Sequence, residues 1–534
     1  MNSRAATVLA ELFSDSPLRH AQFRRFYIGS IGAALGYTMQ STVAAWLMAT
    51  LTPSPFMVAL VQTASTAPAL LFGLLAGALA DIVDRRHVIL VTQGVLVASA
   101  ALLGALELAG LIGPAALLAF TFLIGTGFTI YLPAQGASTN DLVARAEIPR
   151  AVALNAVAFN VARAVGPALA GAIAAGIGSG SALLASAAFF AVMVVAVHGW
   201  RSPKRTIPGV PETIISGIES GLRYTRHSPT MRALILHNFT FTLWASALWA
   251  LLPVIARDQL GLGAGGYGML SAGFGLGAIT SAMIVPKGLH RTSINTMVIG
   301  AALLWLVAAL LIAWTSYTAV ALVGAFGCGA SWVGCLASLS AGTQSSAPAW
   351  VRARMVAMNL ISGQIAMAVG AAVWGSVASA SGTRIALAVS AGAMLILVAI
   401  NRYMRLRMGD EAMVTAGTMP ELVVASEPHP DDGPVLIQVE YRVDEPNQNE
   451  FLRLIRSNET VRRRNGAVDW RVFRDLAEDA RFVERFVIRS WAEYVRLRTR
   501  MTVADREIQA RIEALQQAGV PVRVSRLIGV DLIE

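Results

Sequence analysis

The sequence predicts an all-α polytopic membrane protein with twelve transmembrane helices in two six-helix halves, followed by a small α+β domain. Charged residues make up only 14% of the 534 residues and hydrophobic residues 55%, whereas an average soluble chain is about 25% charged. The segment from Tyr27 to Leu79 contains no charged residue. Because about 20 apolar residues span a bilayer, this segment holds two spans, with a turn at Thr52–Pro55.

Further apolar stretches of the same length follow along the chain. The twelve stretches lie near residues 26–50, 56–80, 87–109, 113–133, 151–176, 180–199, 232–255, 265–285, 293–313, 317–340, 355–379 and 383–403. The polar segment 200–231 separates the sixth stretch from the seventh. The predicted halves are therefore residues 1–199 and 232–407.

The segment between the halves contains its own pattern. Ile214, Ile215, Ile218 and Leu222 recur at helical spacing. This spacing predicts a short amphipathic helix on the cytoplasmic surface, and the alternative is an ordinary loop.

Basic residues in the connecting loops fall almost entirely on one side of the predicted bundle. With the N-terminus in the cytoplasm, the opposite side holds only Arg257 and Arg384. A cytoplasmic excess of Lys and Arg is typical of multi-pass proteins, so both chain ends are predicted to be cytoplasmic. The net charge of +10 therefore indicates topology in a lipid bilayer and not a nucleic-acid partner.

The two halves resemble each other around their fifth helices. At an offset of 204 residues, four positions match: Arg150 with Arg354, Asn155 with Asn359, Gly166 with Gly370, and Gly171 with Gly375. Parallel repeats of this kind characterise one large transporter architecture.

No metal site or disulfide is predicted. Cys328 and Cys335 lie seven residues apart in one apolar stretch, where side chains two helical turns apart cannot reach the bridging distance. They are expected to be small buried apolar residues.

The composition changes after Arg407. Residues 408–434 read as a linker rich in Gly, Pro, Ser and acidic residues. Residues 435–534 are predicted to form strands at Val435–Val443, Val468–Asp475, Arg481–Ile488 and Val520–Val530, a helix at Pro446–Asn465, and a second helix from Trp491 that breaks near Thr502. The order β-α-β-β-α-β predicts a ferredoxin-like split β-α-β domain.

The loop after the second predicted helix carries a motif. Gly77, Leu79, Ala80, Asp81, Arg85 and Arg86 resemble the signature loop of the major facilitator superfamily, with Ile82 in place of an Arg and Asp84 in place of a Gly. The resemblance implies a cytoplasmic gate. Gly77 would allow close helix approach, Asp81 would accept hydrogen bonds from a helix N-terminus, and the arginines would bridge to acidic residues. The alternative is that the arginines only fix topology.

Arg163 is the one basic residue deep inside a predicted span. A charge there is costly and usually faces a cavity or a partner. Asn160 lies on nearly the same face, and Pro167 leaves the carbonyl of Arg163 without a helical donor. The corresponding residue of the second half is Met367. We therefore predict a polar cavity site for an anionic or carbonyl-rich substrate. The alternative is a structural arginine that snorkels to the membrane surface or pairs internally, for example with Glu107.

The same helix resembles the fifth-helix Gly-Pro motif that is associated with exporters of this superfamily. The matching residues are Gly166, Pro167 and Gly171, and Ala170 stands where a Gly is usual. Further cavity candidates, each with helix packing as the alternative, are Gln40, Asn155, His237, Asn238, Trp244, Trp332, Asn359 and Gln364.

Over nearly its whole length the chain resembles the enterobactin-exporter-like, or transmembrane secretion effector, subgroup of the superfamily. The supporting segments are Phe23–Tyr27, Leu51–Pro55, Ala153–Pro167 and Pro133–Ala134, which is predicted to close the fourth helix. The resemblance implies a transporter, not an enzyme, that exports siderophores, drugs or other small hydrophobic metabolites across a bacterial inner membrane.

Several aspects of this function come from the resemblance alone. It implies no cofactor and an ion gradient, expected to be protons, as the driving force. However, no membrane-embedded Asp is evident, and Thr121–Pro133 lacks the Arg of the usual antiporter motif.

Two alternatives remain open. One is an importer of the same fold. The other is a membrane-tethered enzyme, because the tail resembles the dimeric antibiotic-biosynthesis monooxygenase fold, which also implies dimerisation. Its candidate residues are Asn458, Trp470, Trp491 and Tyr494.

Overall fold

The computed structural model describes residues 16–417, 422, 424 and 426–530 except for 201–213. The chain divides into two compact units. The first, here called the membrane unit, contains Met1–Gly209, His237–Leu339 and Leu360–Met404. The second, the tail unit, contains Val210–Leu236, Ser340–Asn359 and Arg405–Glu534. Each is described by itself.

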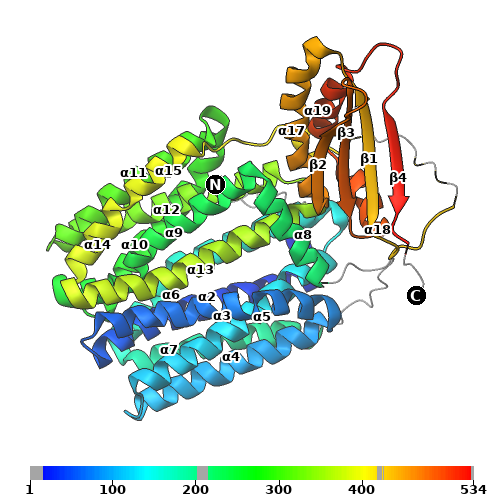
Figure 1. The fold of residues 1–534 in the computed structure, drawn as a ribbon. Coiled ribbons are helices and arrows are strands. Elements are labelled where there is room, and N and C mark those ends of the chain that lie inside the picture. The colour runs from blue at the N-terminus through cyan, green and yellow to red at the C-terminus, as the bar shows by residue number, and fades with distance from the viewer. Residues whose placement is uncertain (1–15, 201–213, 418–421, 423, 425, 531–534) are drawn as a thin grey trace, which may run out of the picture. The chain divides into compact units, whose positions relative to one another are not determined.

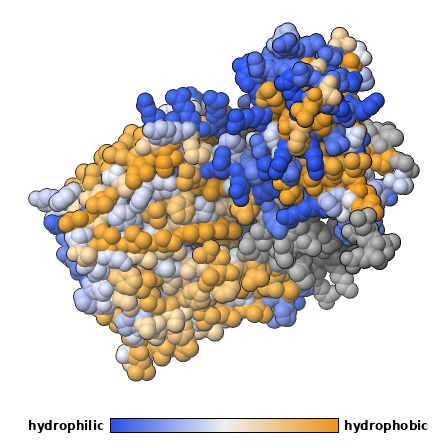
Figure 2. Space-filling view, in the orientation of Figure 1, coloured by the Kyte–Doolittle hydropathy of each residue, from blue (hydrophilic) through white to orange (hydrophobic). Residues whose placement is uncertain are grey.

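The membrane unit is a set of long helices that run side by side (Figure 1). The first half consists of α2 (Ala21–Leu51), α3 (Pro55–Ile82), α4 (Arg85–Leu108), α5 (Pro114–Asp141), α6 (Ile148–Ile177) and α7 (Ser179–His198). The second half consists of α9 (Pro229–Val254) with a π-turn at Ile255–Gln259, α10 (Ala264–Arg291), α11 (Ile294–Trp314), α12 (Thr318–Ser346), α13 (Ala349–Ser381), α14 (Thr383–Gly392) and α15 (Met394–Tyr403). Their visible face is mostly hydrophobic (Figure 2), as contact with lipid requires.

Eleven segments of the described chain are long and apolar enough to cross a membrane, not the predicted twelve. The predicted first span, α2, is absent from this set. Its 31 residues include Gly29, Ser30, Gly32, Gly36 and Gln40, which lower its hydropathy. Many of these residues are buried against other helices, so polar and small residues face protein there instead of lipid. The count of twelve stays a prediction.

Several predicted helices differ from the structure in their ends or continuity. The fourth helix was expected to close at Pro133, but α5 continues through it to Asp141. A proline removes only one helical hydrogen bond, and neighbouring helices tolerate this in a bundle. The last predicted span consists of two helices, α14 and α15, that meet at Ala393.

The tail unit contains a four-stranded antiparallel sheet. Its strands are β1 (Val435–Arg442), β2 (Asp469–Arg474), β3 (Arg481–Ile488) and β4 (Arg523–Ile528), in the order β2-β3-β1-β4. The helices are α17 (Gln448–Asn465), α18 (Trp491–Arg500) and α19 (Val503–Glu513), with a short α16 (Glu411–Val414) in the linker. This is the predicted β-α-β-β-α-β order. The predicted break near Thr502 is also confirmed, because Thr502 caps α19.

The alternation predicted for β1 is observed. Val435, Ile437, Val439 and Tyr441 are buried, and their neighbours on β3 are Ile488, Phe486, Glu484 and Phe482. One buried position of β3 is therefore a glutamate.

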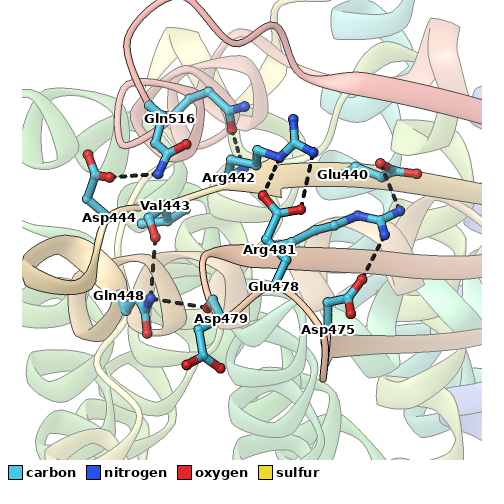
Figure 3. Close-up of polar contacts among 11 residues, drawn as sticks. Glu440, Arg442, Val443, Asp444, Gln448, Asp475, Glu478, Asp479, Arg481 and Gln516 are labelled. Atoms are coloured by element: carbon cyan, nitrogen blue, oxygen red, sulfur yellow. Dashed lines mark hydrogen bonds and ion pairs between the residues drawn. The ribbon is translucent and has the colours of Figure 1, made fainter.

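A group of polar contacts lies at one end of the sheet (Figure 3). Arg442 pairs with Glu478, with 2.8 Å between Nε and Oε1, and Arg481 pairs with Glu440 at 3.1 Å and with Asp475 at 2.7 Å. Two arginines meet three carboxylates here, and all five side chains are partly exposed. These pairs fasten the β2–β3 turn to β1.

The predicted linker helix is present, but the side chains of Ile214, Ile215 and Ile218 lie outside the described part. This helix is α8 (Ile214–His227), and the face that is buried in the tail unit contains Ser220, Gly221 and Tyr224. Leu222, on the predicted apolar face, is 59% exposed. Contact of α8 with a membrane surface stays a prediction.

Candidate functional site

The signature loop between α3 and α4 is partly as predicted. Gly77 does not mediate close helix packing, because no described atom lies within 4 Å of a Cβ built on it. The side chain of Asp81 lies outside the described part. Asp84 caps α4 by accepting a hydrogen bond from the backbone N of Arg86 at 2.8 Å.

Arg85 is buried and forms the predicted bridge to an acidic residue. Its guanidinium pairs with Asp141 at the end of α5 and donates to the carbonyl oxygens of Ala80, at 3.3 Å, and Ala137, at 3.2 Å. The contact thus joins α3, α4 and α5 within one half.

Arg86 has a different partner from the predicted one. It donates to the carbonyl oxygens of Val197 and His198, at 3.4 and 2.6 Å. These belong to the last turn of α7, where a helix leaves carbonyl groups unpaired and favours positive charge. Both arginines therefore organise the first half, beyond setting topology.

We expect Arg85→Gln to destabilise the protein by about 3 kcal/mol, because it leaves the carboxylate of Asp141 largely buried without its partner. The side chains of Arg85 and Asp141 are only 9% and 16% exposed. Thermal unfolding of the purified protein would measure the loss. The double variant Arg85→Gln/Asp141→Asn should be less destabilised than the sum of the single variants, and strict additivity would contradict the pairing.

Glu147 forms a second polar contact that the sequence analysis did not identify. It accepts from Arg19 at 2.9 Å and lies 3.0 Å from Nε2 of His20. Burial raises the pKa of this carboxyl, but the hydrogen bonds from His20 and the backbone of Ala144, with the charge of Arg19, lower it overall. The segment before α2 is thereby fastened to the loop before α6.

The glycines of the fifth-helix motif lie where α6 packs closely against other helices. A Cβ built on Gly166 would lie 2.9 Å from Cβ of Thr38 in α2. A Cβ on Gly171 would lie 2.8 Å from Cα of Gly268 in α10. The hydroxyl of Thr38 also donates to the carbonyl oxygen of Ala162, at 3.0 Å.

The second half repeats this arrangement. A Cβ built on Gly370 would lie 2.7 Å from the carbonyl oxygen of Leu243 in α9, and one on Gly375 would lie 2.5 Å from Cβ of Ala59 in α3. In each repeat, the first glycine therefore packs within its own half and the second packs against the other half. The repeat detected in the sequence has a matching set of contacts.

Contacts between the halves lie in the parts of the helices remote from the arginine-rich loops. Thr63 donates to the carbonyl oxygen of Ala368 at 2.9 Å, and the backbone N of Phe56 donates to Ser379 at 3.1 Å. Trp46 also stacks on Tyr267, with ring centroids 6.0 Å apart. This structure is therefore closed on the side opposite the arginine-rich loops.

Arg163 of α6 faces aromatic rings from both halves. Its guanidinium carbon lies 5.6 Å from the ring centre of Phe159 and 5.9 Å from that of Trp249 in α9. Such distances suit cation–π attraction. No ion pair of Arg163 is recorded among the described residues, and Glu107, the predicted alternative partner, packs against Gly180 at the start of α7.

Trp249 belongs to an aromatic cluster of the second half. It contacts Phe274, with ring centroids 4.6 Å apart, and Trp332, at 5.9 Å; Trp332 also contacts Phe241 and Trp305. Within the described chain, the indole N–H groups of Trp249 and Trp305 are buried without an acceptor. The cluster thus offers hydrogen-bond donors beside the cation.

The other predicted cavity residues do not gather in one place. Asn155 donates to Thr139 at 2.8 Å, whereas Asn160 donates to the carbonyl oxygen of Ala156 in its own helix. Trp244 packs on Trp374 instead of joining the cluster. The remaining candidates are buried or half-buried: Gln40, His237, Asn238, Asn359 and Gln364. Among the predicted residues, the structure connects Arg163 with Trp332, through Trp249.

Two of the four tail candidates, Asn458 and Trp470, contact a residue that sequence reasoning missed, whereas Trp491 and Tyr494 pack on each other with ring centroids 5.4 Å apart. Glu484 is fully buried and accepts from Asn458 at 3.1 Å, Trp470 at 2.9 Å and Arg462 at 3.1 Å. Burial alone would lower the pKa of Arg462, but the Glu484 carboxylate raises it above its ordinary value. Burial, followed by the charge of Glu484, raises the pKa of Tyr441 well above its ordinary value. This is a closed structural network with no exposed acid–base group.

We expect Glu484→Gln to destabilise the tail by about 3–5 kcal/mol, because Arg462 would keep a buried charge without a counter-ion. The matched control is Glu459→Gln, which removes a partly exposed pair with Arg463 and should cost less than about 1 kcal/mol. Hydrogen exchange of β1 and β3 in the full chain would report both effects. Equal protection in the two variants would contradict a structural role for Glu484.

The chain was compared with known proteins. A family model described as transmembrane secretion effector matches residues 13–532. The chain belongs to this family of the major facilitator superfamily. The transporter is therefore a multi-pass membrane protein, and the fold that the signature loop implied is confirmed.

Individual relatives agree with this assignment. The multidrug efflux pump Tap of Mycolicibacterium fortuitum is 25% identical over 208 residues, which are 37% of this chain and 50% of Tap. The chain thus spans about half the length of this curated relative. The structure of the nucleoside transporter NupG matches with a TM-score of 0.60 and 14% sequence identity. The match covers 72% of this chain and 100% of NupG. The human organic anion transporter MFSD10 matches with a TM-score of 0.52 and 18% sequence identity. The match covers 71% of this chain and 98% of MFSD10.

Groups that could hold a metal ion were also sought. Within the described residues, no cluster of three or more His, Cys, Asp or Glu side chains has a suitable arrangement. Cys328 and Cys335 are buried and free.

Proposed function

We propose that the transporter exports small hydrophobic or amphipathic molecules, such as siderophores, drugs or other metabolites, by alternating access. The observation that carries this proposal is Arg163. It is a cation without a recorded ionic partner in the described chain, held between Phe159 of its own half and Trp249 of the other half. An intramembrane charge in such a setting marks a substrate pathway.

The surroundings of Arg163 favour a particular substrate chemistry. A guanidinium binds carboxylate and carbonyl oxygens through directed hydrogen bonds, and the indole rings of Trp249, Trp305 and Trp332 suit an apolar or aromatic body. The buried N–H groups of Trp249 and Trp305 would donate to further oxygens. We infer an amphipathic substrate with an anionic or carbonyl-rich group.

The topology fits loading from the cytoplasm. If the arginine-rich loops are cytoplasmic, the contacts between the halves close the outer side, and the described conformation loads from the cytoplasm. Rocking of the halves would then release substrate outside. The signature loop, with Arg85 and Arg86 holding the first half together, would serve as the cytoplasmic gate. The expected driving force is a proton gradient across a bacterial inner membrane, with antiport as the expected coupling.

The test is transport by the purified protein in proteoliposomes of defined orientation, under an imposed proton gradient. Candidate substrates would come from an untargeted comparison of molecules secreted by wild-type and deletion cells. Gradient-dependent movement from the side of the arginine-rich loops supports export. Movement in the reverse direction would establish an importer, and chemical conversion of the molecule would establish an enzyme.

We also infer that the sheet of the tail unit is a ferredoxin-like domain. Its strand order and antiparallel pairing support this assignment. Dimerisation through this domain is tested by the mass of the purified transporter measured by light scattering.

A further inference from the structure

The tail unit contains a joint between the linker helix α8 and the start of α18. Two ion pairs form it, one with its arginine on α8 and one with its glutamate on α8. Arg223 donates to Glu493 at 2.6 Å, and Arg489 donates to Glu219 at 2.8 Å. In α8, Glu219 lies four residues before Arg223. At the start of α18, Arg489 lies four residues before Glu493, so each acidic residue faces a basic one. All of these residues lie in the tail unit.

Aromatic contacts strengthen the joint. Arg464 of α17 lies over Tyr224 of α8, at 5.4 Å from the ring centre, and Arg500 of α18 lies over Trp350 at the start of α13, at 4.4 Å. Arg354 of α13 donates to the hydroxyl of Ser220 at 2.7 Å. The sheet domain therefore packs on α8 and on the first turns of α13.

A small cavity lies inside this joint, and its charges do not balance. Its volume is about 90 Å³, and its lining contains four arginines, Arg223, Arg489, Arg496 and Arg500, against two glutamates, Glu219 and Glu493, with Ser220. Both glutamates are already engaged in the two ion pairs. The cavity wall therefore carries two positive charges in excess of its negative ones.

The lining also contains unused hydrogen-bond donors. The Nε atoms of Arg223 and Arg496 are buried, and neither has a hydrogen-bond partner in the described part of the chain. A buried donor without an acceptor is costly, and clustered positive charges in a partly buried site repel one another. One anion in the cavity would relieve both costs.

The size and the donors restrict the ligand. One water molecule needs about 10–15 Å³ of such volume, so the cavity has room for a small oxyanion. Guanidinium groups bind phosphate oxygens in a planar, two-pronged geometry. We propose that the joint between α8 and α18 is a binding site for a phosphate group, and that its occupancy holds the sheet domain on the linker helix.

Such a group has two sources, a free phosphate or the head group of an anionic phospholipid. The first experimental arm titrates inorganic phosphate into the purified full-length transporter in detergent and measures binding by calorimetry. The second measures hydrogen exchange of α8 and α18 in phosphatidylcholine nanodiscs with and without phosphatidylglycerol. Both arms use the wild type, Arg496→Gln, and the matched control Arg498→Gln, a residue of the same helix outside the cavity lining.

Saturable phosphate binding that is about tenfold or more weaker in Arg496→Gln, but unchanged in Arg498→Gln, supports a free-phosphate site. Protection of α8 and α18 by phosphatidylglycerol that only Arg496→Gln loses supports a lipid head group. Arg496→Glu, which places a carboxylate in the cavity, should abolish the response in either arm. The proposal is overturned if neither ligand has an effect in the wild type, or if both glutamine variants lose it equally.

Discussion

Replacing Gly171 with valine is expected to stop transport while leaving the transporter inserted and folded. A Cβ at this position would lie 2.8 Å from Cα of Gly268 in the other half, which is closer than side-chain and backbone carbons approach. Overpacking of this kind costs about 1–3 kcal/mol, a shift of roughly five- to a hundredfold away from the conformation closed on that side. Alternating access needs that conformation once in every cycle.

Two comparisons sharpen this prediction. Gly375→Val should have a similar effect, because Gly375 occupies the equivalent contact against Ala59. Gly176→Val on the same helix as Gly171 is the control, since no described atom lies within 4 Å of a Cβ built there. Transport in proteoliposomes and labelling of an Ala175→Cys site by an impermeant thiol reagent would report the outcome. Wild-type transport in Gly171→Val would refute the role of this contact.

The second large effect is expected at Arg163. Arg163→Met installs the residue that the second repeat has at the equivalent position, and it should lower transport about ten- to a hundredfold, because charge-assisted hydrogen bonds to the substrate are lost. Arg163→Lys keeps the charge and should retain part of the activity, although lysine lacks the planar geometry of arginine. Asn160→Ala is the control, because the described hydrogen bond of Asn160 goes to Ala156 of its own helix.

Thermal stability distinguishes a substrate-binding role from a structural one. A half-buried cation without a recorded partner in the described chain costs folding free energy, so Arg163→Met should unfold at the same temperature as the wild type or higher. A lower unfolding temperature together with lost transport would show that Arg163 supports the fold instead of the substrate.

Much of the membrane unit could be predicted because its signals are local. Hydropathy gave the apolar helices, and the register of the repeat correctly paired Gly171 with Gly375. The predicted end of α5 comes too early because the apolar run shows only which residues lie in the bilayer. The helix itself continues through Pro133 into polar residues. The span count differed for a related reason, since α2 faces protein over much of its length.

The site was predicted less completely because it depends on tertiary contacts. Arg163 was identifiable as a charge inside an apolar stretch, but its neighbour Trp249 was not, since nothing local to α9 distinguishes it from Trp244. Glu484 had a signal that was overlooked. It stands between Phe482 and Phe486 on the buried face of an alternating strand, where a carboxylate requires partners. The joint at α8 depended on pairing residues 270 positions apart.

The buried glutamate of β3 also determines which pairing of the sheet is allowed. Successive side chains of a strand point to opposite faces, so a slip of one residue exchanges the two faces completely. Such a slip would move Glu484 out of the core and Arg485 into it, beside Arg462, and would leave Asn458 and Trp470 without their acceptor. An apolar residue at this position would penalise the misaligned strand much less. The ion pair thus selects a single alignment of β3 against β1 while the domain folds.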